Sequence, residues 1–148
     1  MGLDYGSVTV GVAMSDALGL TAQPCETISR SKENHLRRTL ARISELVSEN
    51  DIGLIVLGKP VHMDGSEGER VAMVRAFAEK LETRIQIPVV YCDERLTTVE
   101  ADGVLEELGI PKAERKKKID AVAAAIILRD YMNQEALRHT DKSGEAGL

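Results

Sequence analysis

Aromatic residues are scarce in this chain, which has no tryptophan, one phenylalanine and three tyrosines among its 148 residues. Proteins that hold single-stranded nucleic acid by stacking its bases need several aromatic side chains for that purpose. The composition therefore argues against recognition of bases on aromatic platforms. If the chain binds a nucleic acid, we expect it to recognise backbone and shape.

Positive charge is also in deficit, because 19 lysine and arginine residues face 24 aspartate and glutamate residues, a formal net charge of −5. This balance argues against a protein that coats nucleic acid through bulk electrostatics. Any polyanionic partner would have to meet a local basic patch.

Cysteine and long apolar runs are nearly absent. Cys25 and Cys92 lie far apart in the sequence and have no CxxC or Cys/His ligand spacing. We interpret them as reduced thiols of an intracellular protein and expect no structural zinc site. No apolar stretch reaches membrane-spanning length, and the opening MGLDYG has no basic region followed by an apolar secretion segment. We therefore expect a cytoplasmic protein without a membrane partner.

The residues that are present suffice for one ordinary domain, since 43% of them are hydrophobic. Val8–Asp16 alternates apolar with small or polar residues, which predicts a β-hairpin with the short strand Met1–Tyr5. A third strand is predicted near Cys25–Ser29. The apolar runs Leu54–Gly58 and Ile87–Cys92 predict two more strands, the first of them buried on both faces.

Helical patterns separate these strands. One helix is predicted from Ser31, a second after a loop over residues 59–70, and a third from a Thr97 capping box to a stop at Gly109. The last helix is the apolar one whose front carries Asp120. Strands that alternate with helices after an initial hairpin predict an α/β domain with a mixed sheet. We place this domain at residues 1–138 and expect residues 139–148 to form a flexible tail.

Three carboxylates stand at the edges of apolar elements, namely Asp4, Glu94 and Asp120. Each has an ordinary interpretation: Asp4 as a turn residue, Glu94 as the partner of Arg95 in a salt bridge, and Asp120 as a helix N-cap. Because successive strand side chains point to opposite faces, only one of Asp93 and Glu94 can join a given site. Taken one at a time, these residues leave both interpretations open.

Taken together, the three carboxylates match a known chemical requirement. Mg²⁺ prefers carboxylate oxygens, takes one or two from the protein, and completes its octahedron with water and substrate phosphate. Two such ions can stabilise the attacking and leaving oxygens of a phosphoryl displacement. A cation would also offset the repulsion among neighbouring carboxylates. The residues therefore point to a divalent-metal site.

Four stretches of the sequence resemble, in order, the signature blocks of the YqgF family of RNase H-like nucleases, also called RuvX. They are GLDYGSVTVGVAMSD, IVLGKPVHMDGSEGER, PVVYCDERLTTVEA and KKKIDAVAAAIIL. The resemblance covers residues 1–133. It implies an RNase H-like fold, a mixed five-stranded sheet flanked by helices, and a metal-dependent phosphodiesterase that matures the 5′ end of pre-16S ribosomal RNA. An older label for the same family is Holliday junction resolvase.

By position, the resemblance implies that Asp4, Glu94 and Asp120 are the catalytic residues and the ligands of one or two Mg²⁺ or Mn²⁺ ions. It also relates Arg95, Arg70 and Ser66 to family positions, which makes them candidates for substrate binding. 

Shortly before Asp120, the run Arg115, Lys116, Lys117 and Lys118 forms a local basic patch that could contact a phosphate backbone, and its three lysines are candidates for substrate binding. A solvated charge run is an equally common reason for such residues. Val8 and Thr9 depart from the family pattern, because basic residues are common at that point. We therefore expect no phosphate contact from the hairpin.

Three functions remain open at the level of sequence. The first is a nuclease that acts on structured RNA, a precursor of ribosomal RNA. The second is a resolvase of four-way, branched DNA. The third is a non-catalytic adaptor that binds nucleic acid or protein. The carboxylates favour an enzyme, and they do not distinguish RNA from DNA or a monomer from a homodimer.

Overall fold

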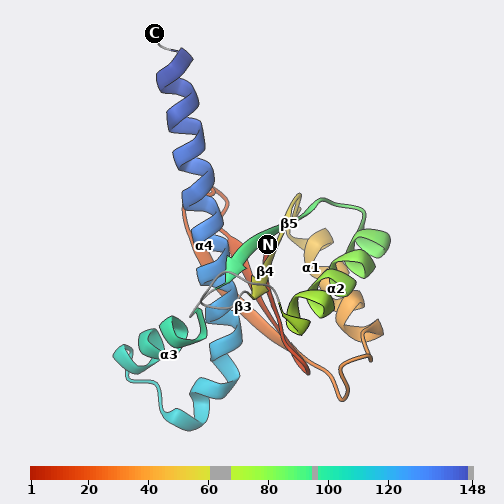
Figure 1. The fold of residues 1–148 in the computed structure, drawn as a ribbon. Coiled ribbons are helices and arrows are strands. Elements are labelled where there is room, and N and C mark those ends of the chain that lie inside the picture. The colour runs from red at the N-terminus through yellow and green to blue at the C-terminus, as the bar shows by residue number, and fades with distance from the viewer. Residues whose placement is uncertain (61–67, 95–96, 147–148) are drawn as a thin grey trace.

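The computed structural model describes residues 1–60, 68–94 and 97–146, without the side chains of residues 97–99, 116–117 and 139–146. Figure 1 shows how the helices and strands of these segments are arranged around one sheet. In chain order they are β1 (Gly2–Tyr5), β2 (Thr9–Ser15), β3 (Ala22–Ser29), α1 (Arg37–Glu49), β4 (Ile55–Pro60), α2 (Glu69–Ile85), β5 (Val89–Glu94), α3 (Thr97–Glu107) and α4 (Lys112–Ala146).

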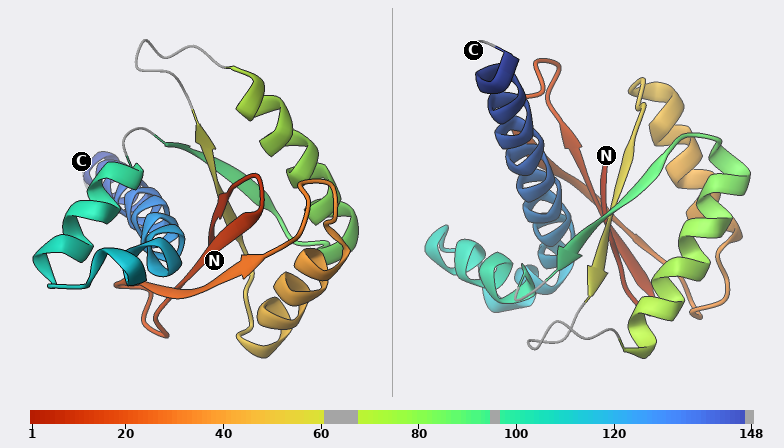
Figure 2. Two further views of the ribbon diagram at one scale, coloured as in Figure 1. Left: turned by 90° about the horizontal axis from the view of Figure 1, so that it is seen from below. Right: turned by 45° about the horizontal axis from the view of Figure 1, so that its top comes forward.

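The sheet has five strands in the order β3-β2-β1-β4-β5. β1 pairs antiparallel with β2, and β2 pairs antiparallel with β3, whereas β1 to β4 and β4 to β5 are parallel pairs. The predicted mixed five-stranded sheet is thus confirmed. Helices α1 and α2 cover one face of it, and α4 crosses the other face with α3 packed on its outer side (Figure 2).

Alternation along the strands divides the core between the two faces. Leu3 and Tyr5 of β1 pack into the cluster shared with α1 and α2, as does Leu57 of β4. Val56 instead packs with the α4 residues of the second cluster. Since successive strand side chains point to opposite faces, Asp4, which lies between Leu3 and Tyr5, faces α4.

The first helix begins later than the sequence predicts, at Arg37 and not at Ser31. Buried Leu36 and Leu40 lie at its start, whereas Ser31 is exposed and its hydroxyl lies 3.2 Å from Nδ1 of His35. Serine, asparagine and histidine are weak helix formers. The helix therefore begins where apolar side chains first reach the core.

The last helix begins earlier than predicted, which changes the interpretation of Asp120. Helix α4 starts at Lys112, directly after Pro111, so Asp120 lies more than two turns inside it and is not an N-cap. The basic residues before Asp120 are good helix formers, and they extend the helix ahead of its buried apolar part. The other end of α4 continues to Ala146, beyond the predicted domain end at residue 138. The flexibility of residues 139–148 stays a prediction.

No helix in the described segments is long and apolar enough to cross a membrane.

Candidate active site

Asp4 is a strand residue and not the turn residue of its ordinary interpretation. It lies in β1, opposite Gly11 of β2. The turn comes later, where the backbone N–H of Gly6 donates to the carbonyl of Thr9 at 2.7 Å. The strand therefore holds the Asp4 carboxylate on the side of the sheet that faces α4, where Asp4 is partly buried.

A glycine beside Asp4 lets helix α4 approach the sheet. A Cβ atom at Gly11 would lie 1.9 Å from the backbone carbonyl oxygen of Asp120, and one at Gly2 would lie 2.7 Å from that of Ala124. Any larger residue at position 11 would push the helix away from the sheet. Because Gly11 is also the β-sheet partner of Asp4, this contact brings Asp120 next to Asp4.

Glu94 reaches the same side from β5. It is the last residue of that strand, two residues after buried Cys92, and strand side chains two residues apart point to the same face. Since Cys92 packs toward α4, Glu94 faces α4 as well. A Cβ at Gly58 would lie 2.8 Å from Oε2 of Glu94, so the missing side chain leaves the room that the glutamate carboxylate uses. The carboxyl groups of Asp4 and Glu94 share a hydrogen bond.

This arrangement raises the pKa of Asp4 to about 8. Burial is the largest cause, followed by the charge of Glu94, the hydrogen bond to it, and the charge of Asp120. The guanidinium of Arg70 lowers the pKa, but not enough to offset these causes. The structure thus brings all three predicted carboxylates close enough to influence one another's charge. The positive charge of Arg70 does not offset the cost of ionising Asp4.

The donor set fits a hard divalent cation. Among the described residues, no group of three or more His, Cys, Asp or Glu side chains is gathered tightly enough to hold a metal ion by itself. Asp4 and Glu94 are in direct contact, and Asp120 interacts with Asp4 through space. Since Mg²⁺ usually takes only one or two protein carboxylates, this pair could hold a cation whose other ligands are water and phosphate. The repulsion that raises the pKa of Asp4 would then be relieved.

Asp93 is oriented differently from Glu94. Its carboxylate is 61% exposed and lies 3.8 Å from the ammonium of Lys59. Lys59 is the β4 residue in register with it. The two neighbouring acids therefore use opposite faces of β5, as the alternation of strand side chains requires.

The structure describes the side chains of only two of the predicted substrate-binding residues, Arg70 and Lys118. Arg70 has internal partners, because its Nη2 donates to the carbonyl of Tyr5 and its Nη1 to Glu33, both at 3.1 Å. Lys118 is exposed, but at two residues from Asp120 it points about 200° away around the helix. The substrate contacts of both residues stay predictions. Arg95, Ser66 and the side chains of Lys116 and Lys117 lie outside the described residues.

Two features of the site escaped the sequence interpretation. Gly11 and Gly58 make room for Asp120 and Glu94, and an isolated glycine inside a strand pattern was the available signal of a close approach. Arg30 is the second feature. Its Nη2 donates to the carbonyl of Gly6 at 2.5 Å, and its guanidinium lies 4.8 Å from the centre of the Tyr5 ring. Nothing in the local sequence around Arg30 indicated this contact with the turn that follows Asp4.

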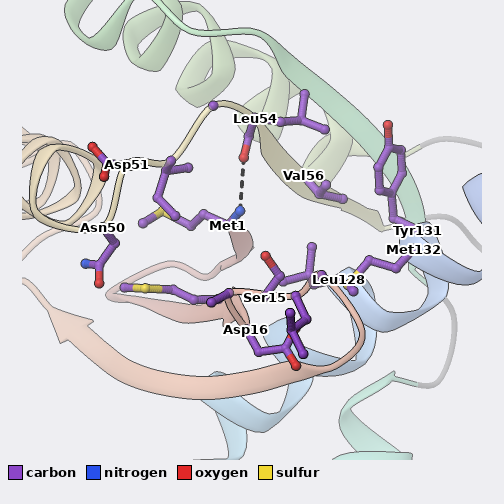
Figure 3. A pocket seen from close by; sticks show the side chains of 16 residues that line it. Met1, Ser15, Asp16, Asn50, Asp51, Leu54, Val56, Leu128, Tyr131 and Met132 are labelled. Atoms are coloured by element: carbon purple, nitrogen blue, oxygen red, sulfur yellow. Dashed lines mark hydrogen bonds between the residues drawn. The ribbon is translucent and has the colours of Figure 1, made fainter.

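A pocket of about 910 Å³ lies elsewhere, at the opposite end of the sheet (Figure 3). Its lining includes the apolar residues Met1, Leu54, Leu128 and Met132, and none of the three site carboxylates contributes to it. The dashed line in Figure 3 marks the hydrogen bond from the amino group of Met1 to the carbonyl of Leu54, 3.0 Å long. This pocket is therefore separate from the candidate active site, despite its size.

The arrangement of the sheet and its flanking helices is the RNase H-like fold. The solved structures "T. thermophilus RuvC in complex with Holliday junction substrate" and "Thermus thermophilus RuvC structure" match with TM-scores of 0.53 and 0.52. The first match has 18% sequence identity and covers 91% of this chain and 94% of that one. The second has 16% identity and covers 91% and 95%. At such identities the likeness concerns the fold.

The family model described as "RuvX: Holliday junction resolvase" matches residues 1–134. A protein of Lachnospira eligens named "Putative pre-16S rRNA nuclease" is 55% identical over 135 residues, which are 91% of this chain and 96% of that protein. A protein of Agathobacter rectalis with the same name is 47% identical over 133 residues, which are 90% and 93% of the two chains. The chain belongs to the RuvX family.

Membership in this family, together with these relatives, supports a function of the nuclease or resolvase type. The protein is accordingly a hydrolase that acts on the phosphodiester bonds of a nucleic acid.

Proposed function

We propose that this protein is a divalent-metal-dependent nuclease of the cytoplasm that processes the 5′ end of pre-16S ribosomal RNA. The observation that carries the proposal is the hydrogen-bonded pair of Asp4 and Glu94 with Asp120 in electrostatic reach. The names of the relatives in Lachnospira eligens and Agathobacter rectalis supply the substrate class.

The three carboxylates would act together on a bound metal ion in this mechanism. A bound Mg²⁺ or Mn²⁺ supplies stabilisation of negative charge on the attacking and leaving oxygens. Asp4, on a central strand, and Glu94, at the end of β5, would hold the ion, while Asp120 approaches from the opposing helix. Since β1 and β5 belong to one sheet and α4 packs against it at Gly11, the fold itself holds the three groups near one another.

The direct test is cleavage of a labelled pre-16S fragment by the purified protein with Mg²⁺, with Mn²⁺ and with EDTA. We expect metal-dependent cleavage at the 5′ end, and a loss of at least about 100-fold for Glu94→Gln or Asp120→Asn, because each removes a charge that the metal requires. Asp93→Asn is the matched control for Glu94→Gln, since the neighbouring acid faces away, and it should retain activity within a few-fold. Full activity of Asp120→Asn would refute the assignment of that ligand.

A second candidate function is resolution of four-way DNA, which the description of the family model favours. The same variants should be incubated in parallel with a four-way DNA junction. Cleavage of the junction without cleavage of the RNA would reverse our ranking of the two substrates. If neither substrate is cut and Mn²⁺ binding measured by calorimetry is unaffected by Asp4→Asn, the nuclease mechanism itself is wrong for these residues.

A further inference from the structure

A second pocket, of about 570 Å³, opens beside the first turn of α1. Its lining includes Arg30, Arg37 and Arg38, together with His35 and Asn34, and it contains no carboxylate. Arginine is the residue best suited to phosphate, because its planar fork of N–H donors matches two phosphate oxygens at once. The pocket therefore has the lining of an anion site.

The positive charge in this pocket is not neutralised by the part of the chain that the structure describes. There, neither Arg37 nor Arg38 forms an ion pair, whereas Arg42, Arg115 and Arg129 all lie within 4.0 Å of carboxylates. This concentration of unpaired arginine is unexpected in a protein whose net charge is −5. Charges left without partners at a concave surface attract an oppositely charged ligand.

Arg30 also lines the pocket and has no carboxylate partner among the described residues. Its Nε donates to the backbone carbonyl of Glu33 at 3.1 Å and its Nη2 to that of Gly6, so both partners are neutral. Its Nη1 is buried and has no hydrogen-bond partner among the described residues. The acid next in the chain, Glu33, is engaged by Arg70 at 3.1 Å.

The backbone of α1 adds to the positive potential. Its N-cap is the apolar Leu36, whose side chain makes no capping hydrogen bond, and the first turn contains no acidic residue. The first N–H groups and the positive end of the helix dipole therefore remain available to an anion beside Arg37 and Arg38.

The pocket lies at the same end of the sheet as the carboxylates. Arg30 links the two places, because it binds the carbonyl of Gly6, two residues after Asp4. Asp4 faces α4, whereas Tyr5, under the guanidinium of Arg30, faces α1 and α2. In the left view of Figure 2, which looks at the molecule from below, α1 and α4 lie on either side of the strands. A polyanion that crosses the end of the sheet could therefore meet the carboxylates and the pocket at once.

We propose that this pocket binds a backbone phosphate of the nucleic-acid substrate, at a position other than the bond that is cleaved. The inference rests on the proposed function, because it assigns a second contact to the same substrate. It also explains how an acidic protein holds a polyanion without basic residues in its first hairpin. Two contacts on opposite faces of the sheet would fix the path of the strand across the active site.

The test compares Arg37→Gln/Arg38→Gln with Arg84→Gln/Arg138→Gln, a control that removes the same charge. Arg84 lies in the last turn of α2, and Arg138 pairs with Glu135 in the C-terminal part of α4. Binding of a fluorescent pre-16S fragment to the full chain is measured by anisotropy in EDTA at several salt concentrations. We expect the pocket variant to bind at least about 10-fold more weakly and its log–log salt slope to fall by about one or two, with less than about a 2-fold change for the control.

Equal affinities of the two double variants would overturn the proposal. It would also fail if titration with inorganic phosphate or AMP detected an arginine-dependent site while RNA binding stayed unchanged, because the pocket would then serve a small anion. Cleavage assays separate this inference from the proposed function. If the wild type cuts no RNA but the pocket variant still loses RNA affinity, the pocket contact stands and the assigned activity fails. If the wild type cuts the RNA and the pocket variant binds it as tightly as the wild type, the assigned activity stands and the pocket contact fails.

Discussion

The raised pKa of Asp4 makes a specific prediction about stability. Ionising a carboxyl whose folded pKa is about 8, against 3.8 in the unfolded chain, costs free energy that the folded state must supply. The favourable contribution of the protonated group is complete below pH 3.8 and is lost as the pH rises through about 8. Replacing Asp4 with asparagine keeps the shape of the side chain and removes this titration.

The size of the effect follows from the shift. About four pKa units correspond to roughly 6 kcal/mol in the free energy of unfolding at pH values above 8. Asp4 keeps some contact with solvent, and its ionisation depends on that of Glu94, so the full figure overstates the cost and we expect about 3 kcal/mol. For a chain of this length that corresponds to a rise of roughly 10 °C in the midpoint of thermal unfolding.

The assay is urea and thermal unfolding of the wild type and Asp4→Asn in EDTA, followed by circular dichroism near pH 4 and above pH 8. The variant should match the wild type at the acidic pH and be more stable at the alkaline one. Asp93→Asn, an exposed acid, should show no such gain. Added Mn²⁺ should then stabilise the wild type and not Asp4→Asn. If Asp4→Asn is less stable than the wild type above pH 8 in EDTA, the carboxylate is already compensated and our account of the site is wrong.

Two further predictions concern packing and thiol chemistry. Gly11→Ala should destabilise the fold by more than about 3 kcal/mol in urea unfolding, because its Cβ would overlap the backbone of Asp120. The control Gly103→Ala, whose Cβ would meet no atom within 4 Å, should be neutral or stabilising by up to about 1 kcal/mol. Equal effects of the two substitutions would contradict the close approach of α4. Exposed Cys25, whose pKa is raised by partial burial and by the charge of Glu26, should still react faster with a thiol reagent than buried Cys92. Burial raises the pKa of Cys92 to about 11, and this thiol should react only on unfolding. Two equally fast thiols per chain would contradict the burial of Cys92.

The two cysteines show what the structure adds to a prediction made from sequence spacing. The sequence predicts two unpaired cysteines from their spacing alone, and both are free. The structure adds that Cys25 lies on β3 and Cys92 on β5, the two opposite edges of the sheet. An intramolecular disulfide between them is therefore excluded by distance across the strands.

Boundaries of elements were less accessible to sequence reasoning than their existence. The sequence predicts that the last helix starts at the apolar run after Asp120, whereas this run is the buried part of the longer helix α4. Periodicity reports which residues face a core, and a helix extends beyond its buried part wherever the flanking residues favour helix. The same distinction explains the late start of α1, where weak helix formers precede Leu36.

The sequence by itself determined the mixed sheet, the alternation of faces along its strands, and the three acids at the edges of apolar elements, because these follow from short-range periodicity and residue type. Only the tertiary structure decided that Asp4 and Glu94 share a hydrogen bond, that Asp120 approaches them, and that unpaired arginines collect beside α1. The physical reason is that these contacts join segments far apart in the chain. They depend on where the helices pack on the sheet. Side-chain volume controls this packing, because the glycine at position 11 lets α4 approach β2.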